Sequence, residues 1–123
     1  MSLWILLGAV NGFISVAAGA FGAHALRGKL EPRMVEVFET GARYQMFHAL
    51  ALILVGLFVL VRPTATLANG AGWAFLAGTV IFSGSLYALA LSGIKVLGAI
   101  TPFGGVAFLV GWVLFAIAAL KSG

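Results

Sequence analysis

Only ten of the 123 residues carry a formal charge, and their positions divide the chain into four long uncharged stretches. Seven of the ten lie between Arg27 and Arg43, and the other three are Arg62, Lys95 and Lys121. The uncharged stretches are residues 1–26, 44–61, 63–94 and 96–120. Each can hold an apolar helix of about 20 residues, the length that crosses about 30 Å of hydrocarbon.

The composition indicates that the solvent of this chain is lipid. Hydrophobic residues make up 63% of it and charged residues 8%, whereas a soluble domain has about 25% charged residues. So few charges cannot provide a polar surface, which excludes a soluble domain, a disordered protein and a nucleic-acid-binding domain. The chain also lacks cysteine and aspartate, so disulfides, thiolate nucleophiles and Cys-ligated metals are excluded and paired-carboxylate chemistry inside the membrane has no residues to use.

Helices are the predicted elements, because no uncharged stretch alternates polar and apolar residues as a membrane barrel strand does. Backbone groups in lipid must be satisfied within the chain. We therefore predict an all-α integral membrane protein, a four-transmembrane-helix bundle in a single domain, residues 1–123. A signal peptide is the alternative for the first helix, but no Lys or Arg precedes it, so we expect a retained span. The predicted spans are about 3–25, 44–61, 70–91 and 102–120.

Two positions guide the predicted starts of the third and fourth spans. Asn69 precedes an apolar run and is the expected N-cap of the third span. Pro102 is the expected start of the fourth, because the residue before a proline is pushed away from helical geometry. Residues 96–101 are then a half-buried lead-in.

The charged segment before the second span is predicted to be a short amphipathic helix at the membrane interface. Pro32 suits the first turn of a helix. Glu36, Glu39 and Arg43 fall on one face, and the last two have the i, i+4 spacing of an ion pair. We interpret the charge run as a solvated face. Gly41 leaves open whether this segment and the span form one long helix or bend.

The distribution of Lys and Arg predicts the orientation in the membrane. With four spans, the loops at 26–43 and 92–101 share one side and carry five Lys or Arg residues. The other side carries Arg62 and Lys121. Because cytoplasmic loops are enriched in Lys and Arg, both termini are predicted to lie outside.

Four segments carry a family resemblance: GAFGAHALR (19–27), YQMFHALAL (44–52), FSGSLYALAL (82–91) and TPFGGVAFLVGW (101–112). They resemble the YgdD-type family, small four-span membrane proteins classed as a domain of unknown function. The resemblance covers nearly the whole chain. It implies a multi-pass protein of the bacterial inner membrane, and it implies no reaction and no catalytic residues.

Five polar residues are predicted to lie at one depth, about one turn inside the cytoplasmic boundary. At about 1.5 Å per residue, His24 and His48 reach similar depths on adjacent spans, and we expect their imidazoles to approach one another. Intramembrane polar residues usually face the bundle interior. The alternatives are a polar pocket or proton-conducting cluster and, favoured here, hydrogen bonding between helices. The candidate cluster is His24, Gln45, His48, Tyr87 and Thr101.

A second polar layer is predicted near the midplane. Its hydroxyls can bond their own helix four residues back and so be inert. The amide of Asn11 needs a partner in hydrocarbon, which we expect on another helix, with a transport path as the sharper alternative. This layer consists of Asn11, Ser15, Thr79 and Ser83.

Small residues mark the expected helix contacts, since they allow the close approach that drives helix association in lipid. The candidates are Gly8, Gly12, Gly19, Gly104 and Gly111. Gly12 lies centrally on the stripe of the first span, so we expect a close contact there and damage from Gly12→Leu. The stripes can serve packing within one bundle or a homo-oligomer seam, and both alternatives stay open.

The function favoured by the sequence is a non-enzymatic structural or partner-binding helical bundle. The alternative is a small transporter or channel that uses the polar cluster around His24 and His48. A membrane enzyme or electron-transfer protein is a third, weaker interpretation, because the chain is poor in nucleophiles and acids and lacks Walker, Rossmann and zinc-protease motifs. No cofactor and no metal are expected. A zinc site needs three or four ligands, and the obvious candidates are only the two histidines, Glu36 and Glu39. Ligation of a haem by the two histidines is the alternative, but no Cys-x-x-Cys-His attachment motif is present. The expected partners are the lipid bilayer and a second copy of the chain or an unknown protein, but not nucleic acid.

Overall fold

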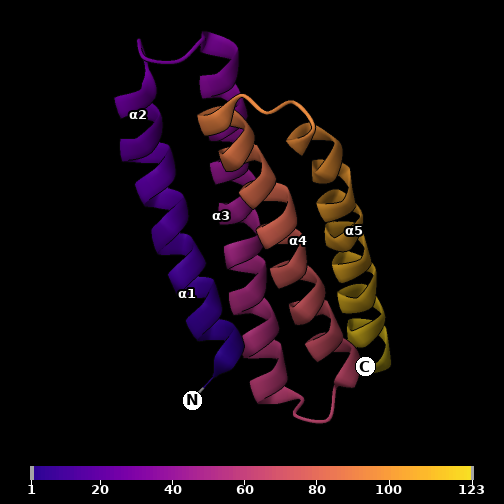
Figure 1. Ribbon diagram of the computed structural model, residues 1–123. Helices are drawn as coiled ribbons and strands as arrows, with labels where there is room; N and C mark the ends of the chain where they lie inside the picture. The colour runs from indigo at the N-terminus through magenta and orange to yellow at the C-terminus, as the bar shows by residue number, and fades with distance from the viewer. Residues whose placement is uncertain (1, 123) are drawn as a thin grey trace.

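Four long helical segments run alternately up and down in the structure, a computed structural model that describes residues 2–122 apart from the side chain of Ser122 (Figure 1). Each segment is long and apolar enough to cross a membrane. The predicted all-α, four-span architecture is confirmed, and the described residues contain no strand. The elements are α1 (Leu3–Val16), η1 (Ala17–Gly22), α2 (Ala23–Leu26), α3 (Pro32–Val61), α4 (Thr66–Ser92) and α5 (Leu97–Ser122).

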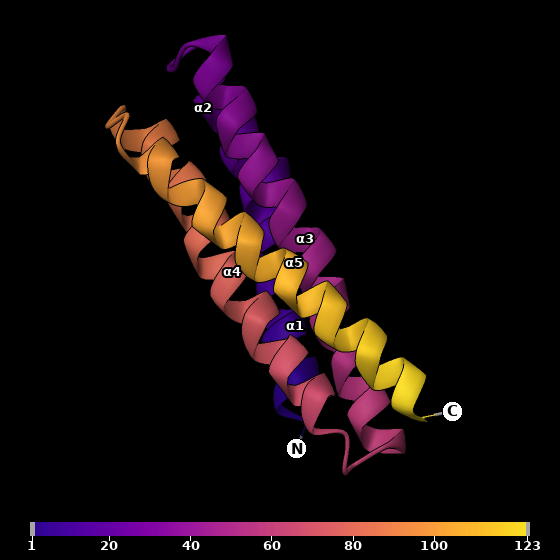
Figure 2. The same cartoon turned by 90° about the vertical axis from the view of Figure 1, so that its right-hand side faces the viewer.

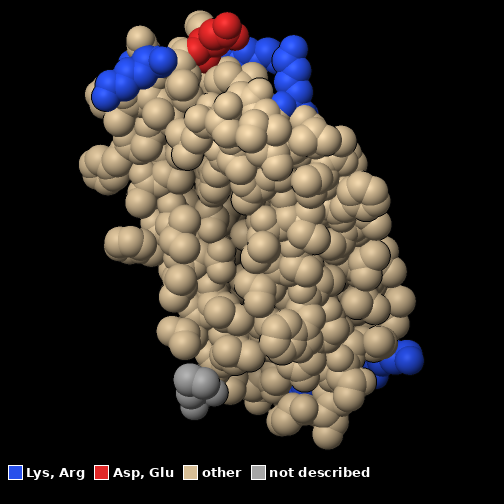
Figure 3. Space-filling model, in the orientation of Figure 1, with Lys and Arg blue, Asp and Glu red and all other residues tan. Residues whose placement is uncertain are grey.

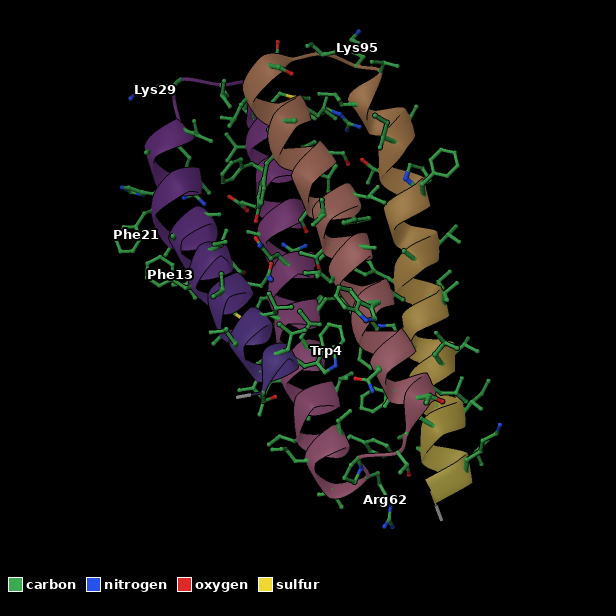
Figure 4. The ribbon with its side chains drawn as sticks, turned by 60° about the horizontal axis from the view of Figure 1, so that its bottom comes forward. Trp4, Phe13, Phe21, Lys29, Arg62 and Lys95 are labelled. Atoms are coloured by element: carbon green, nitrogen blue, oxygen red, sulfur yellow. The ribbon has the colours of Figure 1, made fainter. Side chains whose placement is uncertain are left out.

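The central pair of the bundle is α3 and α4, which pack along each other. Helix α1 packs on α3, and α5 packs on α4. In Figure 2, α5 lies in front of the α3–α4 pair and α1 lies behind it. The spans of α3 and α4 are accordingly more buried than those of α1 and α5. The outer helices therefore offer the larger faces to lipid. Phe13 of α1 and Phe21 of η1 point outward from the bundle, whereas Trp4 lies between helices (Figure 4).

The first span is one continuous helical segment that contains a π-helical stretch, η1. The buried residues of α1 recur at spacings of four, three and four, ending at Ser15, and the next buried residue is Ala23, eight positions on. A π turn absorbs one extra residue. It thereby returns Ala23 to the face that packs on α3.

The charged segment and the second span form one helix, α3, without a break at Gly41. The ring of Tyr87 occupies the space beside Gly41, where a Cβ atom would lie 3.0 Å from it. The expected ion pair between Glu39 and Arg43 is wrong. Glu39 instead accepts from Arg27, with 3.2 Å between Oε1 and Nη2, because the chain reversal after α2 brings that guanidinium over α3.

The start of α4 differs from the prediction, because Asn69 is not an N-cap. Helix α4 begins at Thr66, so Asn69 lies one turn inside it. Its Oδ1 accepts a hydrogen bond from Nε1 of Trp4 at 2.8 Å. The amide of Asn69, which the sequence pattern predicts to cap α4, therefore makes a tertiary contact with α1 instead.

The start of α5 also differs, because Pro102 lies inside the helix and the predicted lead-in is helical. Gly93 ends α4 with a φ of +73°, a conformation that suits glycine, and α5 begins at Leu97. Pro102 lies in the second turn, so its missing N–H removes a single bond close to the helix start. In membrane helices, neighbouring groups commonly compensate for such a loss.

Three of the five predicted glycines approach a neighbouring helix closely, and so do three that were not predicted, Gly56, Gly72 and Gly78. A Cβ atom on Gly8 would lie 2.7 Å from the carbonyl oxygen of Ala49, and one on Gly111 would lie 2.6 Å from the ring of Phe75. Gly104 lies directly against the backbone of Phe82. Gly12 and Gly19 have only ordinary contact distances, 4.0 and 3.6 Å. The expected close contact at Gly12 is therefore wrong, because α1 and α3 approach more closely one turn earlier, at Gly8.

A single added methyl group tests this difference. We expect Gly8→Ala to destabilise the bundle by about 1–3 kcal/mol, because the new Cβ meets backbone that cannot move aside cheaply. Gly12→Ala should be neutral or stabilising by about 0.5–1 kcal/mol, because its Cβ has room and alanine favours the helix. Unfolding of both variants and of the parent in detergent measures the difference, and equal losses would contradict it. Val10→Leu, at an exposed position on the same helix, should be nearly silent.

Candidate functional site

A chain of hydrogen-bonded side chains crosses the bundle from α4 through α3 to α1. The hydroxyl of Tyr87 donates to Oε1 of Gln45 at 2.7 Å. Nε2 of Gln45 donates to Oδ1 of Asn11 at 2.8 Å. Nδ2 of Asn11 then donates to the carbonyl oxygen of Leu7 at 2.9 Å. The chain thus ends on backbone of its own helix, and each amide oxygen in it is matched to a donor.

This chain joins residues that the sequence placed in two separate layers. Gln45 and Tyr87 belong to the predicted cluster, and Asn11 belongs to the predicted midplane layer. Asn11 and Gln45 are both buried. The expectation that Asn11 finds its partner on another helix is confirmed.

His48 is held separately, against α5. Its ring lies on that of Phe108 with centroids 3.5 Å apart and planes at 7°. Nε1 of Trp112 donates to its Nε2 at 3.1 Å. An indole N–H is a donor only, so Nε2 must be the unprotonated acceptor and Nδ1 carries the hydrogen. Nδ1 then donates to the carbonyl oxygen of Tyr44 at 2.8 Å, which leaves both ring nitrogens engaged.

The predicted approach of His24 to His48 does not occur. His24 lies exposed on α2, in line with α1 (Figure 1). The aromatic rings around His48 come from α4 and α5, namely Phe75, Phe108 and Trp112. The two imidazoles therefore face different parts of the bundle. Their depths also differ, because Gly22 lies beside Phe38, whereas Gly12 lies beside Ala49, the neighbour of His48. The five residues of the predicted cluster separate into the Gln45–Tyr87 pair, His48, Thr101 and His24.

Hydroxyl groups link further helices. Ser15 on α1 donates to the carbonyl oxygen of Ala42 at 2.6 Å, and Ser83 on α4 donates to that of Gly41 at 2.7 Å. Thr101 on α5 pairs with Ser85 on α4 at 2.5 Å between the oxygens. Thr79 donates to the carbonyl oxygen of Phe75 in its own helix, which is the inert arrangement expected for such a hydroxyl.

Three partners in this network were not predicted from the sequence. Ser85 pairs with Thr101, Asn69 accepts from Trp4, and Trp112 donates to His48. Trp112 carried the clearest signal, because it lies in mid-span, away from the membrane interface where tryptophan is usually found. A buried indole N–H usually finds an acceptor, so it pointed to a polar neighbour.

Chemically, the arrangement is a set of hydrogen bonds that hold neighbouring helices together. Polar side chains connect α1 with α3 and α4, α3 with α4 and α5, and α4 with α5. Every buried side-chain nitrogen or oxygen atom that the structure describes has a hydrogen-bond partner. Binding a proton or a metal ion at Nε2 of His48 would first require release of Trp112. The interior is therefore organised for hydrogen bonding between helices.

A double-mutant cycle on Gln45 and Tyr87 measures the strength of the central link. Tyr87→Phe keeps the ring and removes the donor to Gln45, so we expect a coupling energy of about 0.6–2 kcal/mol with Gln45→Leu. Thr79→Val is the matched control, since that buried hydroxyl bonds only its own helix and should couple to neither residue. Unfolding in detergent gives the values. A coupling no larger than that of the control would contradict the link.

Comparison with known proteins gives the family of this chain. The family model "Protein of unknown function (DUF423)" matches residues 18–105. The chain is 50% identical to UPF0382 membrane protein SAB0533 of Staphylococcus aureus (strain bovine RF122 / ET3-1) over 98% of both chains. It is 46% identical to UPF0382 membrane protein YwdK of Bacillus subtilis (strain 168), again over 98% of both. No solved structure matches it significantly. The chain therefore belongs to the DUF423 (UPF0382) family of bacterial membrane proteins, whose function is unknown.

Proposed function

We propose that this protein is a non-enzymatic helical bundle of the bacterial inner membrane that acts by packing or by binding a partner. The observation that carries this proposal is the complete pairing of the described buried polar atoms. A transport path needs polar groups that can exchange a protein partner for water or substrate. Here the amides of Asn11 and Gln45 and the ring of His48 already bond protein partners, on other helices and on the backbone of their own.

The alternative, a small transporter or channel around His24 and His48, has less support. Its two histidines lie on different sides of α3, and proton uptake at Nε2 of His48 would set two N–H donors against each other. The outer faces of α1 and α5 support partner binding instead, including binding of a second copy, since they are the least covered parts of the spans.

The proposed orientation has both termini outside. Lys29 and Lys95 lie at one end of the bundle and Arg62 at the other, together with both termini (Figures 1 and 4). On the face seen in Figure 3, charged side chains gather at the two ends and leave a broad uncharged band between them. The end with more Lys and Arg belongs in the cytoplasm by the usual bias. We further propose that the YgdD-type family and this family are one group, since the segments of the resemblance largely coincide with the matched residues 18–105.

Reconstituted vesicles test the transport alternative. We expect vesicles containing the protein to show the same proton and potassium permeability as empty vesicles, because the polar interior is closed by its own hydrogen bonds. A pH-sensitive dye inside the vesicles reports proton entry under an imposed gradient. A flux above that of empty vesicles, and reduced by His48→Phe, would overturn the proposed function in favour of a channel.

The absence of cysteine allows a clean test of orientation. Single variants Ser2→Cys and Lys29→Cys place one thiol at each end of the bundle. In intact cells, a membrane-impermeant maleimide should label Ser2→Cys at once and Lys29→Cys only after permeabilisation. The reverse pattern would place both termini in the cytoplasm.

A further inference from the structure

Arg43 lies in a lateral groove between α1–η1 and α3 that no other part of the chain covers within residues 2–121. The groove is lined by small residues of the first span and by charged residues of α3 and of the turn after α2. These include Ser15, Gly19, Ala20, Arg27, Glu39 and Arg43. Gly19 and Ala20 are exposed, so the π-helical stretch presents little more than backbone to whatever fills the groove.

The position of Arg43 along α3 places it at membrane depth. Eighteen residue steps separate it from Val61, the last residue of the helix, which corresponds to about 27 Å. The hydrocarbon of a bilayer is about 30 Å thick, and the charged Arg62 marks its opposite boundary. Arg43 therefore lies where the hydrocarbon gives way to the headgroups, about three turns below the start of α3 at Pro32.

Arg43 has no anionic partner within the described chain. The one nearby carboxylate on its face, Glu39, is paired with Arg27 at 3.2 Å. Among residues 2–121, Arg43 makes no ion pair and no side-chain hydrogen bond, and it is exposed. With Arg27 and Glu39 cancelling, the groove keeps one positive charge. A cation at this depth is costly unless it meets a counter-charge.

We propose that this groove binds one anionic phospholipid, whose phosphate is held by Arg43 beside the small residues of η1 and whose acyl chain runs along α1, past Ser15 and Val16. A guanidinium matches phosphate oxygens with two parallel hydrogen bonds. Basic pockets between transmembrane helices are a known way to hold anionic headgroups. Gly19 and Ala20 are exposed and Gly19 lies beside Ala42, so a headgroup held by Arg43 can lie close to the helix backbone there. Binding depends on neither the proposed function nor the proposed orientation, which decides only the leaflet.

Native mass spectrometry of the full-length protein in detergent tests this site. The protein is titrated with dioleoyl phosphatidylglycerol and, separately, with dioleoyl phosphatidylcholine. We expect phosphatidylglycerol to bind at least about fivefold more tightly, and Arg43→Gln to weaken it about fivefold, as expected for one Arg near the membrane surface. Arg33→Gln is the matched control, because it removes the same charge from an exposed position of α3 outside the groove lining. It should change the affinity less than twofold.

A second variant fills the groove without changing charge. Ala20→Leu should weaken phosphatidylglycerol binding several-fold while leaving Arg43 in place, and since the side chain points into an open groove the fold should persist. Equal effects of Arg43→Gln and Arg33→Gln, or equal binding of the two lipids, would overturn the proposal. Displacement of phosphatidylglycerol by soluble glycerol 1-phosphate at the same concentration would overturn it too, since the site would then recognise a free phosphate.

Discussion

A polar atom inside a bilayer has no water to bond, and this constraint explains most of the contacts in the bundle. Helix formation satisfies the backbone, but each polar side chain must find its own partner. Here those partners lie mainly on other helices, so the hydrogen bonds also define which helices are neighbours. Helix α3 receives most of them: Ser15 and Ser83 bond its carbonyl oxygens at Ala42 and Gly41 from opposite sides. The central helix is therefore held between α1 and α4 at a single level.

Close approach of the helices is the condition under which such short side chains can reach across. Lipid gives no hydrophobic drive for helix association, so packing and hydrogen bonds must supply it. Where glycine meets backbone, as Gly8 does at Ala49, two helices come within reach of a serine hydroxyl. Between α3 and α5 the distance is larger, and aromatic rings fill it: Phe108 stacks on His48. In this bundle, small residues therefore allow short distances between helices, and large aromatic rings fill the longer ones.

The number, type and approximate extent of the spans could be predicted because bilayer thickness limits them directly. The starts of α4 and α5 could not be predicted. Asn69 looks like a cap, but it accepts a hydrogen bond from Trp4 on another helix. Pro102 looks like a helix start, but a proline in the second turn is tolerated inside the helix. The polar partners were harder still. His24 was matched to His48 by a depth counted from the sequence, but Gly22 lies beside Phe38, ten residues before His48 on α3. His24 also follows the buried Ala23 by one position, about 100° around the helix from the packed face. The level of a side chain depends on how far neighbouring helices are shifted along each other, and its neighbours depend on its angle around the helix; the sequence specifies neither directly.

Because the buried polar atoms that the structure describes are all hydrogen-bonded, we expect other membrane components to bind this bundle at its outer faces. The interior can change only by exchanging one set of hydrogen bonds for another, and in lipid no water assists that exchange. The groove beside α1 is different, because its cation is exposed and its floor is made of small residues. The π-helical stretch that returns Ala23 to the packed face also brings Gly19 and Ala20 to this surface. The same local irregularity therefore closes the bundle on one side and leaves it open on the other, where a ligand from the bilayer can enter without disturbing the core.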